Sequence, residues 1–188
     1  DNTREEVLPS DVSVRTKVHE YGGADFLVSD GVVYFSNADD NRVYLFDGEI
    51  RAITPVDVNK KCRYADFCIN PDGQYLFAVR ETHQDNQVTN ELVCIFLKEG
   101  TVQVVDSSFE FYSFPKITKS GNRICWTCWN RPDMPWDSTE LWLADLHSDG
   151  SVDAKHCVTG GNNTSIFQPE WGYDGVLHYI SDASGWGN

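Results

Sequence analysis

The stretch Arg63–Arg80, RYADFCINPDGQYLFAVR, carries the sequence pattern of a complete β-hairpin. Tyr64–Ile69 is predicted to form one strand, and Tyr75–Val79, rich in aromatic and β-branched residues, a second. Between them lies Asn-Pro-Asp-Gly, in which Pro presets its own φ, Asp can bond its own backbone and Gly takes a positive φ without steric cost. This strand–turn–strand unit decides the fold because it recurs.

Three further copies of the unit occur along the chain, at spacings of roughly 40 to 55 residues, which is the range of propeller blades. Their strand pairs are Asp25–Val28 with Val32–Ser36, Tyr112–Ile117 with Arg123–Cys128, and Phe167–Trp171 with Val176–Ile180. Two more runs follow each of the first three units, at Val43–Phe46 and Arg51–Ile53, at Leu92–Leu97 and Val102–Val105, and at Leu141–Leu146 and Lys155–Val158. Four short strands per repeat is the plan of a β-propeller blade.

The apolar runs are nearly continuous, as in YLFAV, LVCIFL and ICWTCW, whereas a sheet with one wet face would alternate apolar and polar residues. Such strands need cover on both faces, which neighbouring blades supply. The sequence therefore predicts an all-β partial β-propeller of about three and a half four-stranded antiparallel blades. Ser13–Val18 is predicted as an outer strand of a preceding blade. An antiparallel sandwich with the same strands is the alternative.

A chain of 188 residues is too short for a whole propeller of roughly six to eight blades. Residues 1–188 are therefore predicted to be a fragment of a single propeller domain in a longer protein. The net charge of −14 argues against binding to nucleic acid or to anionic membrane surfaces. No apolar run approaches the ~20 residues of a membrane span.

The six cysteines lie mostly inside predicted strands, where a free thiol packs as a small hydrophobe. Cys125 and Cys128 have the spacing of a redox or zinc motif, but an extended strand sends residues i and i+3 to opposite faces. This usage favours a reducing compartment, so a cytoplasmic location is expected. Two overlapping glycosylation sequons at 162–165 would instead suit a secreted protein.

Long polar connectors are expected to share one face of the molecule. Ser36–Arg42, Arg80–Glu91 and Asn130–Glu140 join second to third strands, and in a four-stranded antiparallel blade they emerge with the connections to the next blade. The minimal Gly turns emerge on the opposite face. Because variable loops on a rigid scaffold carry function, this loop face is the predicted site. The loop Trp129–Asp137, with two Trp and two Pro, is expected to pack on its own blade, cover a partner domain or wall a cavity.

The sequence contains no nucleophile elbow and no Gly-rich phosphate loop. Its five histidines are scattered, and His19-Glu20 lacks the second His of a zinc-binding helix motif because position 23 is Gly. No catalytic residue, metal site or cofactor is therefore predicted within this chain.

Five segments, taken in order, resemble the N-terminal propeller of the prolyl oligopeptidase family, and most closely its acylaminoacyl-peptidase and dipeptidyl aminopeptidase branch. They are VHEYGG (Val18–Gly23), RYADFCINPDG (Arg63–Gly73), VRETH (Val79–His83), WNRPDMPWDSTELWLADL (Trp129–Leu146) and SIFQPEWGYDGVLHYISDASGW (Ser165–Trp186). The resemblance covers nearly the whole chain. Departures from the family pattern occur at Lys119-Ser120-Gly121, Thr82, Arg131 and Gly187.

The resemblance implies a propeller that caps an α/β-hydrolase domain carrying a Ser-Asp-His triad and that restricts access to short peptides. That domain is expected after Asn188, so no triad residue is assigned here. The implied partners are this C-terminal domain and a short peptide, and a homo-oligomer of the longer protein is compatible with them. Charged groups could hold a peptide terminus in the shared cavity. The candidates for lining it are Glu20, Arg80, Glu81, Trp136 and Asp137, with structural salt bridges as the alternative for the charged ones.

Two other functions are compatible with the sequence. One is a non-catalytic protein-interaction propeller. The other is a metal-dependent propeller hydrolase of the lactonase type, which needs carboxylates around the central channel. The first strands would place Asp25, Asp66, Lys116 and Glu170 there, and the lysine counts against a metal site.

Overall fold

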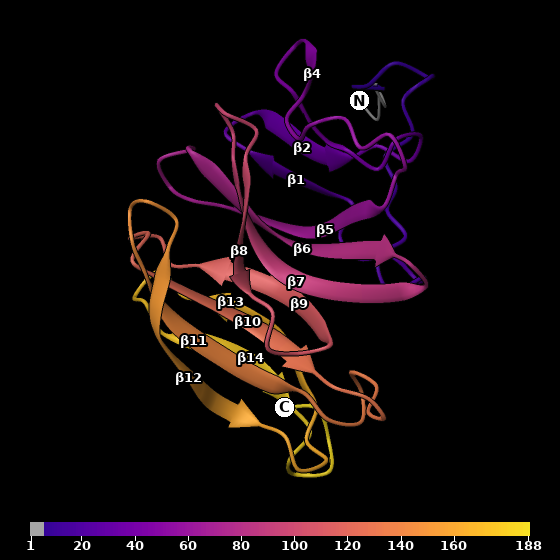
Figure 1. Ribbon diagram of the computed structural model, residues 1–188. Helices are drawn as coiled ribbons and strands as arrows, with labels where there is room; N and C mark the ends of the chain where they lie inside the picture. Colours follow the sequence, from indigo (N-terminus) through magenta and orange to yellow (C-terminus); the bar gives the residue numbers. More distant parts are fainter. Residues whose placement is uncertain (1–5) are drawn as a thin grey trace.

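The computed structural model describes residues 6–188 as β-strands, turns and connecting loops (Figure 1). Three four-stranded sheets and one two-stranded sheet follow one another, and the strands of each are hydrogen-bonded in chain order. Figure 1 shows the sheets stacked in a fan. The predicted partial propeller of about three and a half antiparallel blades is confirmed.

Most strand boundaries lie close to those predicted, while β6, β7 and β12 are longer than predicted. The first blade contains β1 (Phe26–Ser29), β2 (Val32–Ser36), β3 (Val43–Phe46) and β4 (Ile50–Ala52). The second contains β5 (Cys62–Ile69), β6 (Tyr75–Gln84), β7 (Gln87–Phe96) and β8 (Val102–Asp106). The third contains β9 (Phe111–Ile117), β10 (Arg123–Trp129), β11 (Glu140–Leu146) and β12 (Val152–Gly160). The last sheet pairs β13 (Ile166–Trp171) with β14 (Leu177–Ser181).

The second blade is apolar on both faces, as its continuous runs predict. Successive residues of β6 alternate between two cores: Leu76 and Ala78 pack toward the first blade, and Phe77 and Val79 toward the third. The CxxC pair divides in the same way, since Cys125 packs toward the last sheet and Cys128 toward the second blade. The two thiols therefore lie on opposite faces of β10 and serve as core residues.

Each Gly turn closes a hairpin on the face opposite the long loops. In the second blade Gly73 has a φ of +65°, which only glycine adopts without cost. The backbone amides of Gln74 and Tyr75 donate to the side chain of Asn70, at 2.7 and 2.9 Å. The side chain that closes this turn is therefore Asn70, and the Asp72 side chain is exposed.

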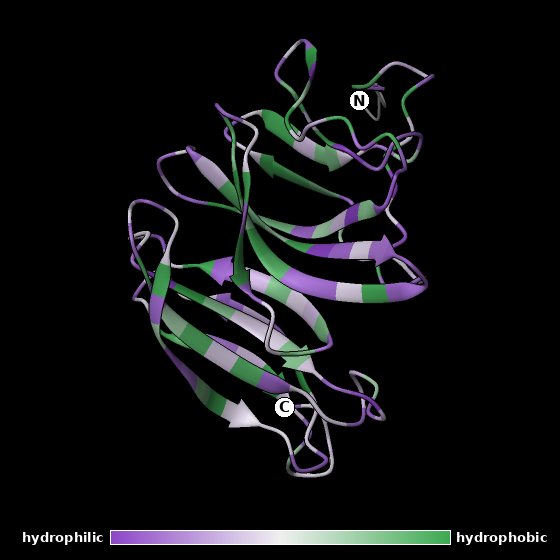
Figure 2. Ribbon diagram, in the orientation of Figure 1, coloured by the Kyte–Doolittle hydropathy of each residue, from purple (hydrophilic) through white to green (hydrophobic). Residues whose placement is uncertain are grey.

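Two predicted segments are wrong in detail. Ser13–Val18 is no strand: it makes one isolated bridge, from Val14 to Asn37, and then continues as a loop. Arg80–Glu91 is no polar connector, because β6 and β7 run on to a two-residue turn at Asp85-Asn86. The polar residues there made the segment look like a loop. Figure 2 shows β7 changing from apolar, inside the stack, to mostly polar toward this turn.

The first strands of successive blades contact each other, β1 with β5, β5 with β9 and β9 with β13, so they line the propeller axis. Three of them carry an irregularity in pairing at equivalent positions. The residues there have left-handed backbones, with φ of 56° at Asp66, 52° at Phe114 and 48° at Gln168. Within residues 6–188 no helix has the length and apolarity needed to cross a membrane.

Candidate functional site

A cavity of about 370 Å³ lies on the loop face, where the first strands of the second, third and last sheets meet. Its walls come from the loop before β1, from those first strands, and from the loop after β10. Most of the lining is aromatic or apolar, with His19, Tyr21, Trp129 and Phe167 among the largest side chains. A volume of this size lies in the range of small-molecule sites.

The loop Lys17–Gly23 forms one wall of the cavity. It precedes the first blade in sequence, yet Val18 is buried in the core between the second and third blades. His19 and Glu20 both have left-handed backbones, with φ of 56° and 66°. A side chain at Gly23 would place its Cβ 2.9 Å from that of Ala65, so the loop passes closer to β5 than other residues allow. Such a conformation persists only where surrounding contacts enforce it.

The enforcing contacts converge on Glu81, whose side chain is 3% exposed. Its Oε2 accepts the backbone amide of His19 at 2.7 Å. Its Oε1 lies 2.9 Å from Nη1 of Arg63 and 2.7 Å from Nε2 of His83. The same Arg63 nitrogen donates to the carbonyl of Lys17 at 2.9 Å and to Glu20 at 2.7 Å. This group, Glu81, Arg63, His83 and Glu20, is called the clamp below.

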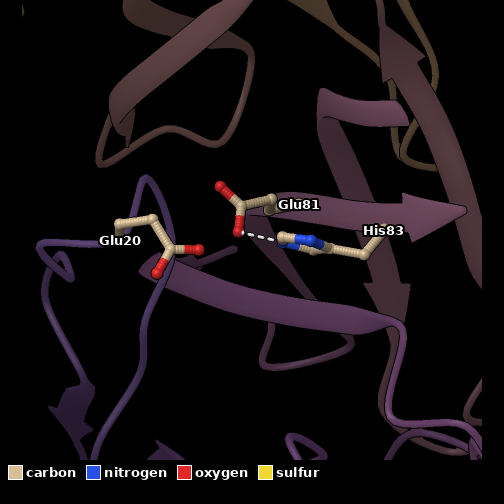
Figure 3. Close-up of side chains that lie close together, drawn as sticks. All are labelled: Glu20, Glu81 and His83. Carbon is tan, nitrogen blue, oxygen red and sulfur yellow. Dashed lines mark hydrogen bonds and ion pairs between the residues drawn. The ribbon is translucent and has the colours of Figure 1, made fainter. Parts of the chain in front are cut away.

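Glu20, Glu81 and His83 have the residue types and spacing of a metal site, and Figure 3 shows their side chains converging. The Arg63 guanidinium, which always carries its charge, already contacts both carboxylates. A metal ion among these three residues would be placed beside a fixed cation. The group therefore has the chemistry of an ion-pair network rather than of a metal centre.

His19 places its ring among aromatic side chains. The centroid of its ring lies 5.3 Å from that of Phe111, 5.6 Å from that of Trp129 and 5.6 Å from that of Tyr21. Burial lowers the pKa of His19, and the Glu81 and Asp66 carboxylates and the Asn90 amide act in the opposite direction. Its Nε2 is buried with no hydrogen-bond partner. The neutral ring therefore serves as part of the apolar wall.

Asp66, on β5, ties the loop before β1 to β9 beside the cavity. Its Oδ1 accepts the amide of Ala24 at 2.7 Å, and its Oδ2 accepts the amide of Phe114 at 3.1 Å. Lys116 pairs with Glu170 at 2.5 Å on the neighbouring strands. Both groups thus bridge blades, and Asp25 accepts the amide of Thr16 at 2.7 Å. The channel carboxylates are engaged in backbone bonds and an ion pair.

The five residues predicted to line a shared cavity lie in three places, and none is on the wall of the cavity described above. Glu20 and Glu81 belong to the clamp. Arg80 points to the other face of β6, where it pairs with Glu91 at 2.5 Å. Trp136 is 65% exposed, and Asp137 accepts the Met134 amide at 3.0 Å in the same loop. Their role in a cavity shared with a second domain stays a prediction.

The loop Trp129–Asp137 covers the gap between the third blade and the last sheet. Trp129 stacks on Phe111 with ring centroids 5.4 Å apart, so the start of the loop packs on its own blade. Further along, the Pro135 carbonyl accepts the Ser165 hydroxyl at 2.8 Å, next to β13. The loop both packs on its blade and, through Pro135, walls the cavity.

Within residues 6–188 no serine or cysteine side chain is hydrogen-bonded to an imidazole, so the described part provides no nucleophile–base pair. Burial raises the pKa of Cys68 to about 11 and of Cys94 to about 12. Thiols of this kind are structural rather than reactive.

Sequence reasoning missed Arg63 and His19 as parts of the site. Arg63 opens the hairpin that defines the repeat, and its cross-strand pairing with Glu81 follows from the hairpin register. His19 lies in the VHEYGG segment, which was noted for its resemblance but not for its contacts. The 62-residue separation between His19 and Glu81 leaves no local signal for their bond.

The fold defines the chain as a segment of a β-propeller with a cavity on its loop face. No family model matches it, and no curated protein sequence matches it. Among solved structures, a puromycin-hydrolyzing peptidase of Mycobacterium tuberculosis is 33% identical with a TM-score of 0.88, covering 99% of this chain and 31% of that one. A puromycin hydrolase is 27% identical with a TM-score of 0.86, covering 96% and 31%.

A prolyl endopeptidase, at 15% identity and a TM-score of 0.56, shares the fold over 83% of this chain and 25% of that one. The resemblance to the propeller of prolyl-oligopeptidase-family peptidases is thus confirmed. The chain spans about a third of the length of the two more similar peptidases.

Proposed function

We propose that this chain is the substrate-gating propeller portion of a serine exopeptidase that acts on short peptides, and that it is not catalytic by itself. The observation that carries the proposal is the 33% identity to a peptidase over 99% of the chain. The chain contributes no nucleophile–base pair within residues 6–188, so the bond-breaking groups belong to another part of the longer protein.

The expected partner is an α/β-hydrolase domain of the same polypeptide, facing the loop face. The cavity of about 370 Å³ opens on that face beside the propeller axis. It is wide enough for one side chain of a peptide and too small for a folded protein, which agrees with a filter for short substrates. Its mostly aromatic lining favours an apolar side chain.

The proposal is tested by reading the gene beyond codon 188 and assaying both products. The longer protein is expected to contain a nucleophile elbow and to hydrolyse aminoacyl or acyl-peptide chromogenic substrates. The pure 188-residue chain is expected to hydrolyse none. A reading frame that ends without the elbow would refute the peptidase assignment and leave an interaction propeller. Turnover by the isolated chain would refute the division of labour.

A further inference from the structure

We propose that Glu81 is a positioning residue: acting with Arg63, it fixes the Lys17–Gly23 loop so that His19 and Tyr21 form a preformed wall of the loop-face cavity. Glu81 itself is buried behind this wall and does not line the cavity. The proposal concerns the shape of the cavity, and only its consequence for peptide selection rests on the proposed function.

The first step is that Glu81 is buried and both of its oxygens are already engaged, so it does not face a peptide. One of its oxygens accepts the His19 amide, and the other contacts Arg63 and His83. A carboxylate that is 3% exposed and engaged in this way acts on its neighbours, not on a ligand. Its reach across 62 residues joins β6 to the loop before β1.

The second step is that the clamp grips the loop at three points. Arg63 holds the Lys17 carbonyl and the Glu20 side chain, and Glu81 holds the His19 amide. Two of these points, His19 and Glu20, are consecutive non-glycine residues with positive φ. Such a backbone conformation is unfavourable for a non-glycine residue and persists only when its surroundings over-determine it.

The third step is that the other backbone hydrogen bonds of the loop lie within it: the Glu20 amide donates to the Lys17 carbonyl at 3.0 Å, and the Gly22 amide to the Val18 carbonyl at 2.8 Å. Tyr21 is 63% exposed, and the Glu20 side chain is 74% exposed. Val18 anchors the start of the loop in the core, but its burial does not fix the rotation of the next peptide units. The clamp therefore decides where the His19 ring lies, and with it the wall that the ring shares with Phe111 and Trp129.

The test compares Glu81→Gln with Glu91→Gln in the 188-residue chain. Both glutamates pair with an arginine across neighbouring strands of the second blade, but Glu91 lies away from the cavity. NMR titration of the His19 imidazole is the readout. If Glu81 positions the loop, E81Q exposes the ring to water, and the pKa of His19 rises toward its ordinary value of about 6.5.

If Glu81 acts on His19 only as a nearby charge, its removal takes away an effect that raises the pKa of His19, and that pKa falls further. This result, or an unchanged pKa, would overturn the proposal. E91Q is expected to leave the titration unchanged. Should E81Q fail to fold, Arg63→Lys decides instead, since the shorter lysine side chain does not bring its ammonium to the position of Nη1, which contacts Lys17, Glu20 and Glu81. R63K is expected to raise the pKa of His19.

In the longer protein, E81Q is expected to raise KM for peptides about tenfold, equivalent to roughly 1.4 kcal/mol of binding, with kcat unchanged. An equal loss of kcat and kcat/KM would contradict a role in shaping the cavity. The NMR result on the 188-residue chain does not depend on any peptidase activity. Failure of the proposed function and failure of the clamp are therefore distinguishable.

Discussion

At the residue scale, a few polar side chains join segments that are distant in sequence. Buried Glu81 joins the hairpin of the second blade to the loop before the first, and half-buried Asp66 joins that loop to the first strand of the third blade. Both residues connect blades through backbone amides. Bonds of this kind fix the relative placement of sheets that the apolar cores alone would let slide.

Asp66→Asn is expected to destabilise the chain by about 1–3 kcal/mol, because the amide group has one acceptor oxygen in place of two. The Ala24 and Phe114 amides then compete for that oxygen. Urea unfolding followed by tryptophan fluorescence measures the change. Asp72→Asn, at an exposed turn, is the control and should change the stability by less than about 0.5 kcal/mol. Equal effects of the two variants would remove the bridging role of Asp66.

Asp106 makes the stability of the chain depend on pH. Its side chain is 4% exposed and accepts bonds from Lys155 at 2.6 Å and the Tyr112 hydroxyl at 2.7 Å. Burial opposes ionisation, but these bonds prevail and hold the pKa of Asp106 below its ordinary value. The carboxylate therefore stabilises the fold above the unfolded pKa of about 3.9, and this stability is lost as pH falls through the lower folded pKa.

The measurement is the difference in unfolding free energy between the parent chain and Asp106→Asn at several pH values. A destabilisation of about 1–3 kcal/mol is expected at pH 7. It should shrink as the pH falls below about 3.9, because the unfolded chain then binds a proton that the folded carboxylate does not yet bind. A difference that stays constant from pH 7 to pH 3 would contradict the ionic role.

At the element scale, the blades differ in how far their strands extend. β6 and β7 are ten residues each, and they carry the second blade beyond its neighbours on the loop face. The extension places Glu81 and Asn90 beside the loop before β1. It depends on a tight turn at Asp85-Asn86, where φ is 48° and 62°. Two positive φ values in a two-residue hairpin define a type I′ turn.

Asn86→Ala is expected to destabilise this hairpin by about 1–2 kcal/mol, since the Cβ of alanine is sterically unfavourable in a left-handed backbone. Asn86→Gly, which pays no such cost, is the matched control. Hydrogen exchange of the amides of residues 83–88 measures the effect locally. Faster exchange in both variants alike would mean that the side chain of Asn86, not its backbone conformation, holds the turn.

At the scale of the whole molecule, stability is distributed unevenly along the stack. The second and third blades are covered on both faces, and Leu92, Tyr112 and Trp126 are almost fully buried. The last sheet has two strands, and Tyr173, at 95%, and Val176, at 50%, are largely exposed. A two-stranded sheet with an open edge is the least stable kind.

Amides of β14 are therefore expected to exchange with solvent faster than those of β10 by at least an order of magnitude. Native-state hydrogen exchange with mass spectrometry at residues 123–129 and 177–181 compares them directly. The two strands differ in their pairing, because β10 is paired on both sides, with β9 and β11, whereas β14 is paired with β13 alone. Equal protection of β10 and β14 would show that the stack unfolds as one cooperative unit.

Much of the fold could be predicted from the sequence because its signals are local. A turn of type Asn-Pro-Asp-Gly, a continuous apolar strand and a repeat spacing are all read within a few residues, and they placed fourteen strands closely. The polar end of the β6–β7 hairpin was wrongly predicted as a loop, because the local sequence there has no apolar run. Its partner is another polar strand, so pairing leaves no apolar signature.

The sequence by itself determined the blades and the face on which long loops gather, because hydrophobic periodicity and turn chemistry act over short distances. Only the tertiary structure decided the site. It placed the His19 amide against Glu81, and it directed Arg80 away from the cavity. It also buried Val18 between the second and third blades, although Val18 precedes the first blade in the sequence. Contacts of that range depend on how whole sheets stack, and stacking is set by the summed packing of many residues rather than by any one segment.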